Sequence, residues 1–385
     1  IFAYREVIAE NPKKPGIIPG VKHTIILNTP KENVTPWKEN VRRSSPAEEV
    51  AKEAEVEMLV QNDIVEESNS PFSNNIVVVK KKDGSLRTCI DFRRLNEITV
   101  FDAFPLSRID ESLDMLGKAK YISTLDNSSA FWSCALDEAA KEMTAFGTRS
   151  HGQLQFKRMP FGLKNATATY ARALMHVLRG LVWKCCVIYC DDSVIYGDTF
   201  DGHMEALHSV MKRYSIHNVN VKLSKCHFAC HETEFVGHTV EVGAGVRVDM
   251  KKIKALLERG RPQDVQTLKS WIGACSYYKR FIKDFAHLIM PMRKIEHVFK
   301  TKTMDIQPLW GPDQERSFVA LKAAMVTAPV LAFPDFEKPF CVASDCSDVA
   351  KGAVLFQIID GVERPIAYYS KGLNEHERKY GISDK

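Results

Sequence analysis

The sequence has no long hydrophobic run, because charged residues interrupt every apolar stretch before the roughly 20 consecutive apolar residues of a membrane helix. It also has no strong excess of one charge, since 53 Lys and Arg against 48 Asp and Glu leave a formal net charge of +5. We therefore expect a soluble protein without a membrane partner. So small a net charge permits a nucleic-acid partner without demanding one.

A disulfide framework is also missing, because the ten cysteines are dispersed and lie mostly in apolar contexts, as expected of a reduced intracellular protein. Cys226, His227, Cys230 and His231 have the residue types of a zinc site. No second Cys/His pair follows at zinc-finger spacing, which favours buried thiols over a metal. The chain starts at Ile1 without a signal peptide, so we expect a piece of a longer protein.

The length of 385 residues predicts about two to four domains. Residues 1–44 are rich in Pro, Lys and Asn and predict an extended lead-in. Ser45, Pro46 and Glu48 form a helix-start pattern, with an N-cap, a proline at the first position and a capping box. The predicted organisation is an α+β body over 45–240, a mainly helical stretch over 241–309, and a strand-rich block over 310–385.

The helical stretch predicts helices over Lys251–Glu258 and Val265–Phe285. The runs that predict strands are rich in β-branched and aromatic residues: Ile76–Val79, Leu86–Ile90, Tyr121–Leu125, Val187–Tyr189, Ser193–Tyr196, Phe340–Ala343, Ala353–Ile359 and Pro365–Tyr369.

Carboxylates stand where two of these runs meet. Asp191 and Asp192 lie between β-prone segments, which predicts a tight hairpin with both acids at or beside its turn, and Asp126 ends another strand-like run. Adjacent like charges are unfavourable unless a cation neutralises them. Three carboxylates on neighbouring strands would suit two Mg²⁺ ions about 4 Å apart, the arrangement used for nucleotidyl transfer. For Asp191 and Asp192 alone, ordinary turn aspartates are the favoured alternative.

Two further segments have a polymerase-like chemistry. Lys80–Arg87 contains an Asp-Gly hairpin signal and predicts a basic finger suited to a triphosphate or a template backbone, although a solvated sheet edge is the commoner meaning of such a turn. Arg158–Ala166 predicts a Pro/Gly turn that leads into a helix. Gly162 would allow close approach of a nucleotide and Phe161 offers a flat face, with a plain loop-to-helix junction as the alternative.

In this order, the motifs closely resemble the reverse transcriptase of gypsy-type long-terminal-repeat retrotransposons, with the retroviral enzymes as more distant relatives. The resemblance runs from about Ser45 to Lys385. The motifs that carry it are Ser70-Pro71-Phe72, Lys80 to Arg87, Asp91 to Asn96, Leu125-Asp126, Thr144-Ala145-Phe146, Arg158 to Ala166, Tyr189 to Asp192, Lys225-Cys226 and Phe235 to His238.

The resemblance implies an α+β right-hand polymerase with fingers, palm and thumb, followed by a connection and a truncated α/β ribonuclease H-like domain. The implied function is an RNA-directed DNA polymerase that adds deoxynucleoside triphosphates to a primer 3′ hydroxyl on an RNA or DNA template. It implies two Mg²⁺ ions, or Mn²⁺, and protease and integrase as neighbouring Pol polyprotein segments. The implied location is intracellular and cytoplasmic, with virus-like particles and the nucleus as further sites.

Carried over position by position, the resemblance implies specific roles. The implied metal ligands are Asp126, Asp191 and Asp192, and Lys225 falls in the motif proposed to protonate the departing pyrophosphate. The implied nucleotide-binding residues are Lys81 and Arg87 at the triphosphate, Phe131 at the sugar 2′ position, where a core aromatic is the alternative, and Phe161 and Gly162 at the nascent base pair. The implied primer grip is Phe235, Val236, Gly237 and His238.

The sequence also departs from the family pattern. Asn127 replaces a usually aliphatic residue, and further departures are Ala130, Ser133, Thr167 and Cys190. Buried without a partner, the Asn127 amide would weaken the palm by about 1 to 3 kcal/mol. These departures raise the alternative of a decayed copy that only binds nucleic acid.

The ribonuclease H-like block matches the family only in part. Asp345 matches the first of four metal-binding acids, and the second is expected just beyond Lys385. We therefore expect no ribonuclease H activity from this chain, because two-metal hydrolysis needs more than one of these ligands.

Overall fold

The computed structural model of the protein describes residues 2–39, 43–80, 84, 86–298 and 303–381. The chain divides into two compact units. Unit 1 comprises Ile1–Ser112 and Tyr121–Cys230, and unit 2 comprises Leu113–Lys120 and His231–Lys385. The domain boundaries expected from the sequence stay predictions.

The α-helices alternate with strands in the first part of the chain and cluster after residue 250. The helices are α1 (Pro46–Gln61), α2 (Arg93–Ile98), α3 (Ile109–Asp114), α4 (Glu138–Met143), α5 (Ala166–Val177), α6 (Phe200–Ile216), α7 (Met250–Leu257), α8 (Val265–Tyr277), α9 (Phe285–Val298) and α10 (Pro312–Val326). Among the described residues, none of these helices is long and apolar enough to cross a bilayer.

The strands form small sheets. The runs that predicted strands are all present, with ends that agree at Leu86–Ile90 and are shifted by up to three residues elsewhere. They are β1 (Lys22–His23), β2 (Val65–Glu67), β3 (Ile76–Lys80), β4 (Leu86–Ile90), β5 (Tyr121–Asp126), β6 (Ala135–Leu136), β7 (Phe146–Gly147), β8 (Gln153–Phe156), β9 (Cys186–Tyr189), β10 (Asp192–Gly197), β11 (His227–Cys230), β12 (Glu232–Phe235), β13 (His238–Glu241), β14 (Gly245–Val248), β15 (Cys341–Cys346), β16 (Ala350–Ile359) and β17 (Val362–Gly372).

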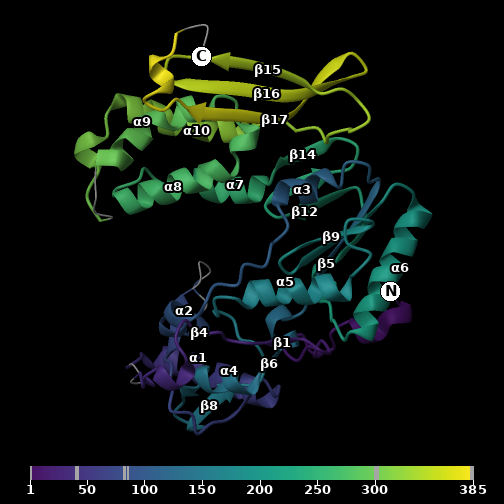
Figure 1. Ribbon diagram of the computed structural model, residues 1–385, viewed down its shortest axis with the longest axis vertical. Helices are drawn as coiled ribbons and strands as arrows, with labels where there is room; N and C mark the ends of the chain where they lie inside the picture. The colour runs from purple at the N-terminus through teal and green to yellow at the C-terminus, as the bar shows by residue number, and fades with distance from the viewer. Residues whose placement is uncertain (1, 40–42, 81–83, 85, 299–302, 382–385) are drawn as a thin grey trace. The chain divides into compact units, whose positions relative to one another are not determined.

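The central sheet of unit 1 has the strand order β11-β5-β10-β9, and its neighbouring strands pair antiparallel. Helices α5 and α6 pack on this sheet (Figure 1). Val187, Val194 and Ile195 are fully buried, so the β-prone runs around the paired aspartates supply apolar side chains to the core. Burial of these side chains holds the turn between β9 and β10 at the edge of a well-packed body.

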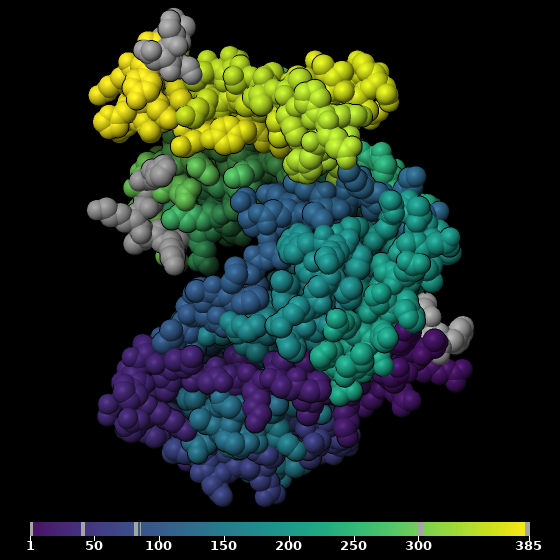
Figure 2. Space-filling model, turned by 45° about the vertical axis from the view of Figure 1, so that its right-hand side comes forward, coloured from purple at the N-terminus to yellow at the C-terminus, as the bar shows by residue number. Residues whose placement is uncertain are grey.

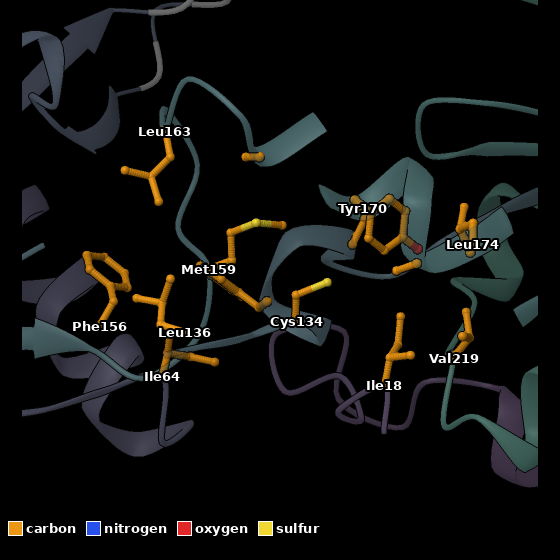
Figure 3. Close-up of a cluster of buried hydrophobic side chains, with 14 of the residues drawn as sticks. Ile18, Ile64, Cys134, Leu136, Phe156, Met159, Leu163, Tyr170, Leu174 and Val219 are labelled. Atoms are coloured by element: carbon orange, nitrogen blue, oxygen red, sulfur yellow. The ribbon is translucent and has the colours of Figure 1, made fainter. Parts of the chain in front are cut away.

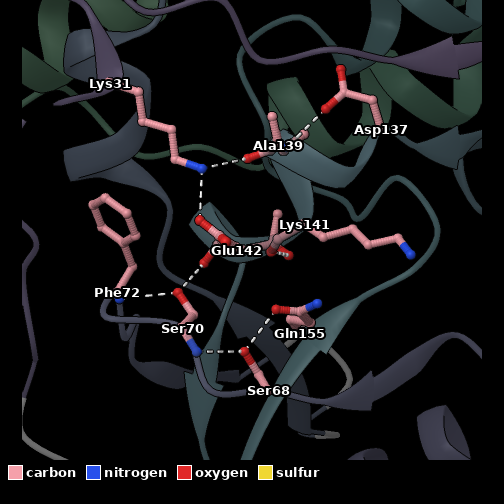
Figure 4. Close-up of polar contacts among 11 residues, drawn as sticks. Lys31, Ser68, Ser70, Phe72, Asp137, Ala139, Lys141, Glu142 and Gln155 are labelled. Atoms are coloured by element: carbon pink, nitrogen blue, oxygen red, sulfur yellow. Dashed lines mark hydrogen bonds and ion pairs between the residues drawn. The ribbon is translucent and has the colours of Figure 1, made fainter.

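The capping box predicted at Ser45 is confirmed: the Ser45 hydroxyl accepts from the Glu48 N–H, and the Glu48 carboxylate accepts from the Ser45 N–H. The Ser70-Pro71-Phe72 motif has a structural role nearby (Figure 4). The Ser70 hydroxyl donates to the Glu142 carbonyl at 2.7 Å and accepts from the Phe72 N–H at 3.0 Å. It therefore ties the segment after β2 to the end of α4.

The N-terminal segment is part of the core of unit 1. Val7, Ile18 and Trp37 are buried in the same cluster as side chains of the central sheet, and Figure 3 shows Ile18 among the members of this cluster. The buried Arg158 guanidinium donates to the Pro15 carbonyl at 2.6 Å. In Figure 2 the purple N-terminal part of the chain lies against teal parts of the same unit. The predicted lead-in thus supplies packing as well as a connection.

Unit 2 contains the sheets β12-β13-β14 and β15-β16-β17, with α9 packed on β17 and against α8 and α10. The single helix predicted over Val265–Phe285 is wrong. Helix α8 ends at Tyr277, and the backbone at Asp284 is left-handed with φ 52°, which a helix cannot continue through. The chain turns there because α9 packs back against α8, a tertiary contact that helical periodicity does not reveal.

Candidate active site

The paired aspartates lie at the turn between β9 and β10, as predicted. Asp192 pairs with Tyr189 across a two-residue loop made of Cys190 and Asp191, and Asp192 is also the register partner of Asp126 on β5. Directly opposite residues of antiparallel strands project from the same face of a sheet. Asp126 is half-buried, whereas Asp191 and Asp192 are exposed. The three carboxylates therefore belong to one corner of the sheet.

Lys225 also reaches this corner, from the short 3-10 turn Leu223–Lys225 that precedes β11. Its ammonium lies 3.1 Å from Oδ2 of Asp126, and the Lys222 N–H donates to the Asp126 carbonyl at 2.9 Å. A cation thus already lies against one of the expected metal ligands. The structure brings together four of the residues that the sequence nominated: Asp126, Asp191, Asp192 and Lys225.

The donor set fits Mg²⁺ in its chemistry, because carboxylate oxygens are the ligands that this hard cation prefers. Within the described ranges, no three Asp, Glu, His or Cys side chains are grouped closely enough to hold an ion. Asp126 and Asp192 face one another in register, and Asp191 is the exposed residue beside them. These are the residues that would hold a metal.

The Cys190–Asp191 turn between β9 and β10 is held in place by a neighbouring buried side chain. Cys190 has φ 56°, a left-handed conformation that is costly for a residue with a side chain. Burial, and then the charges of Asp191 and Asp192, raise the pKa of the Cys190 thiol. Asn127 Nδ2 donates to the Asp191 carbonyl at 2.9 Å, so the residue expected to weaken the palm has a partner for one arm of its amide. Its Oδ1 has none among the described residues.

The residues expected at the incoming nucleotide form a second cluster in unit 1. The Phe131 and Phe161 rings are 5.1 Å apart between centroids, and the Arg87 guanidinium carbon lies 6.0 Å from the Phe161 centroid. Phe161 is 41% exposed, which leaves part of its ring open to a ligand. The expected triphosphate ligand Lys81 lies outside the described residues.

The loop that carries Phe161 is fixed by a residue that sequence reasoning did not nominate. Asn96 donates to the Gly162 carbonyl at 2.8 Å and accepts from the Lys164 N–H at 2.8 Å. Gly162 has φ +94°, a conformation that favours glycine. The sequence did contain a signal for Asn96, because this residue is the last one of the Asp91–Asn96 motif that carries the family resemblance.

A pocket of about 450 Å³ lies beside this cluster in unit 1, and its lining includes Glu55, Arg87 and Phe161. Burial raises the pKa of the Glu55 carboxyl, against the opposing charges of Lys13 and Arg87. The pocket therefore combines apolar walls with a cation and a partly desolvated acid.

The expected primer-grip residues form the hairpin turn between β12 and β13 in unit 2. Phe235 pairs with His238, and Val236 and Gly237 both have positive φ, 45° and 75°. The Tyr277 hydroxyl donates to the Val236 carbonyl, and the buried His238 ring stacks on Phe281 at 5.4 Å. Aromatic residues at the end of α8 and just after it thus stiffen this turn.

Asp345 lies on β15 in unit 2, and its Oδ1 accepts from the Cys346 N–H at 2.8 Å. It is exposed and lines a pocket of about 190 Å³ together with Asp284 and His287. These side chains are not grouped as a metal site within the described part of the chain.

Two family models match the chain. Residues 79–240 match "Reverse transcriptase (RNA-dependent DNA polymerase)", a range that includes Arg87, Phe131, Phe161 and the three carboxylates of the corner. Residues 310–385 match "RNase H-like domain found in reverse transcriptase", which includes Asp345.

Curated relatives match most of the chain. A retrovirus-related Pol polyprotein from transposon opus of Drosophila melanogaster is 36% identical over 343 residues, covering 86% of this chain and 34% of the relative. The Pol polyprotein from transposon gypsy of the same species is 35% identical over 343 residues, covering 86% and 33%. The chain thus spans about a third of the length of these relatives.

Solved structures share the fold. A foamy viral protease-reverse transcriptase dRH in complex with double-stranded DNA has a TM-score of 0.84 at 21% identity, covering 100% of this chain and 65% of the other. The foamy viral protease-reverse transcriptase in complex with an RNA/DNA hybrid has a TM-score of 0.82 at 20% identity, covering 99% and 50%. The expected right-hand polymerase fold followed by a ribonuclease H-like domain is confirmed. The chain therefore belongs to the reverse transcriptase family of retrovirus-related Pol polyproteins, with the RNase H-like domain of that family at residues 310–385.

Proposed function

We propose that this chain is an RNA-directed DNA polymerase that adds deoxynucleotides to a primer 3′ hydroxyl on an RNA or DNA template. The observation that carries the proposal is the corner of the central sheet, where Asp126 and Asp192 are register partners and Asp191 lies in the adjoining turn. Support comes from the reverse transcriptase match, which covers all three residues.

Asp126, Asp191 and Asp192 would hold two Mg²⁺ ions. When bound, such ions activate the attacking hydroxyl and neutralise charge that develops on the leaving pyrophosphate. The contribution of the protein is to hold Asp126 and Asp192 as partners on two strands with buried apolar neighbours, with Asp191 in the adjoining turn. Lys225 would act on the departing group, and its ion pair with Asp126 supports this role.

In this proposal the nucleotide lies against the Arg87, Phe131 and Phe161 cluster. The exposed Arg87 guanidinium would pair with triphosphate oxygens, a charge-assisted contact that is strong for arginine. Phe161 and Gly162 would contact the nascent base pair, and Phe131 would exclude a 2′ hydroxyl by its bulk. Phe235, Val236, Gly237 and His238 would hold the primer terminus through their stiffened turn.

The proposed partners are an RNA or DNA template-primer, deoxynucleoside triphosphates and other Pol polyprotein segments. The foamy viral relatives were solved with an RNA/DNA hybrid and with double-stranded DNA, which supports the choice of template-primer. A cytoplasmic location, including virus-like particles, remains part of the same proposal.

Primer extension on poly(rA)/oligo(dT) with Mg²⁺ tests the function. We expect template-dependent incorporation by the purified chain, and none by Asp191→Asn. The matched control is Asp198→Asn, which changes an exposed aspartate outside the corner and should leave incorporation unchanged. A folded, unsubstituted chain that binds template-primer without incorporation would reject the proposal and favour a copy that retains binding only.

A further inference from the structure

The departure from the family pattern at Asn127 has a specific structural setting. Asn127 directly follows Asp126 at the end of β5, so its side chain lies on the opposite face of the sheet from the Asp126 carboxylate. It is 7% exposed, and it lies beneath the same turn whose exposed face carries Asp191 and Asp192.

The backbone of Asn127 is anchored independently of the turn. Asn127 forms an antiparallel bridge with Val221, and on either side the Ser128 N–H donates to the Asn220 carbonyl at 2.8 Å and the Lys222 N–H donates to the Asp126 carbonyl at 2.9 Å. The side chain therefore extends from a fixed base.

From this base the amide reaches the neighbouring turn. Asn127 Nδ2 donates to the Asp191 carbonyl at 2.9 Å, and the residue before Asp191 is the left-handed Cys190. A strained turn keeps its conformation only when its surroundings over-determine it. The Asn127 amide supplies such a constraint at the carbonyl of an expected metal ligand.

The surroundings limit how the amide can turn. Burial raises the pKa of Tyr170 on α5 and of Tyr214 on α6, and the nearby Asn127 amide lowers both in opposition. Tyr214 is also hydrogen bonded to Ser193, at 2.8 Å. A flipped amide would set Oδ1 against the Asp191 carbonyl, two acceptors facing one another, so the donor arm must point to the turn. Phe131 also contacts the Tyr170 ring, at 6.1 Å between centroids.

We propose that Asn127 is a positioning residue, which ties the end of β5 to the Cys190–Asp191 turn and so sets the spacing of the carboxylates that hold the metal ions. The inference rests on the proposed polymerase function for its catalytic consequence. An aliphatic side chain at this position, the usual family choice, packs in the same space but cannot donate to the Asp191 carbonyl. This chain has replaced that packing with a directional bond.

The test compares Asn127→Leu with the unsubstituted chain by two readouts. We expect amide hydrogen exchange at Cys190, Asp191 and Asp192 to speed up about five- to tenfold, as expected from the loss of one hydrogen bond, while exchange elsewhere in unit 1 stays unchanged. We also expect the Mg²⁺ concentration for half-maximal primer extension to rise several-fold and kcat to fall, while KM for template-primer is unchanged.

The matched control is Asn33→Leu, which changes an exposed asparagine of the same unit and should move neither readout. Unchanged exchange at the turn in Asn127→Leu overturns the proposal. Faster exchange throughout unit 1 also overturns it, because that pattern means general packing. Hydrogen exchange needs no turnover, so even a chain that fails to polymerise would test the hydrogen bond between Asn127 and the turn. In an active chain, faster exchange at the turn without any change in the Mg²⁺ requirement would refute the positioning role.

Discussion

The burial of the N-terminal segment predicts that a single side chain in it supports the polymerase unit. Ile18 is 0% exposed and lies in the core cluster of unit 1, and its N–H donates to the Ser133 carbonyl at 2.8 Å. The neighbouring Ile17 is 43% exposed. The two isoleucines differ in burial while sharing chemistry and position in the chain, so they form a matched pair.

Replacing Ile18 with Ala removes three buried carbon atoms, and at about 0.8 kcal/mol each their transfer to water costs about 2.4 kcal/mol. The cavity left behind adds to this, so we expect unit 1 to lose about 3 to 4 kcal/mol, within the usual range of roughly 2 to 5 kcal/mol. Ile17→Ala should cost less than about 1 kcal/mol, because most surface substitutions have small effects.

Urea unfolding followed by a probe in unit 1 would measure both variants, with the probe needed because two units need not unfold together. Equal losses for Ile17→Ala and Ile18→Ala, or no loss for Ile18→Ala, would refute the conclusion that the N-terminal segment belongs to the core.

Three other expectations follow from the site and its support. Phe131→Ala should reduce discrimination against ribonucleotides by about 10- to 200-fold in kcat/KM, and an unchanged ratio would remove its proposed role at the sugar. Burial lowers the pKa of His23 to about 4, so the imidazole of the folded protein stays neutral above that pH. Its contribution to the free energy of unfolding is therefore fully present above about pH 6.5. As pH falls from about 6.5 to about 4, the free energy of unfolding should drop by up to about 3 kcal/mol. This drop should be absent in His23→Gln, and its persistence in that variant would contradict the assignment to His23. These 385 residues should not cleave the RNA strand of a labelled RNA/DNA hybrid, because Asp345 matches the first of four metal-binding acids and two-metal hydrolysis needs more than one of them. Mg²⁺-dependent cleavage that is lost in Asp345→Asn would prove that expectation wrong.

Local sequence signals predicted local structure well. The Ser45 capping box depends on residues a few positions apart, and it is confirmed. The paired aspartates were found for the same reason, because a hairpin turn is encoded by the two strands that flank it. The partnership of Asp126 with Asp192 required a resemblance as well, since no local pattern fixes which strands pair.

Structure that depends on contacts between distant residues could not be predicted from the sequence. The end of α8 and the left-handed Asp284 are dictated by packing against α9, which helical periodicity does not encode. Asn127 was noticed as a departure from the family, but its partner Asp191 is 64 positions away, so the sequence could not show whether the amide was satisfied. The burial of Ile18 was likewise not predicted, because the segment around it is largely polar.

Asp126 and Asp192, which are register partners on β5 and β10, should act as one unit in catalysis. The most direct measurement is the rate of single-nucleotide incorporation, with saturating Mg²⁺, by Asp126→Asn, Asp192→Asn and the double variant. Because groups that act together are strongly non-additive, we expect each single variant to lose at least about a thousandfold and the double variant to be little slower than the worse single. Near-full incorporation by either single variant, or losses that multiply in the double variant, would contradict the account.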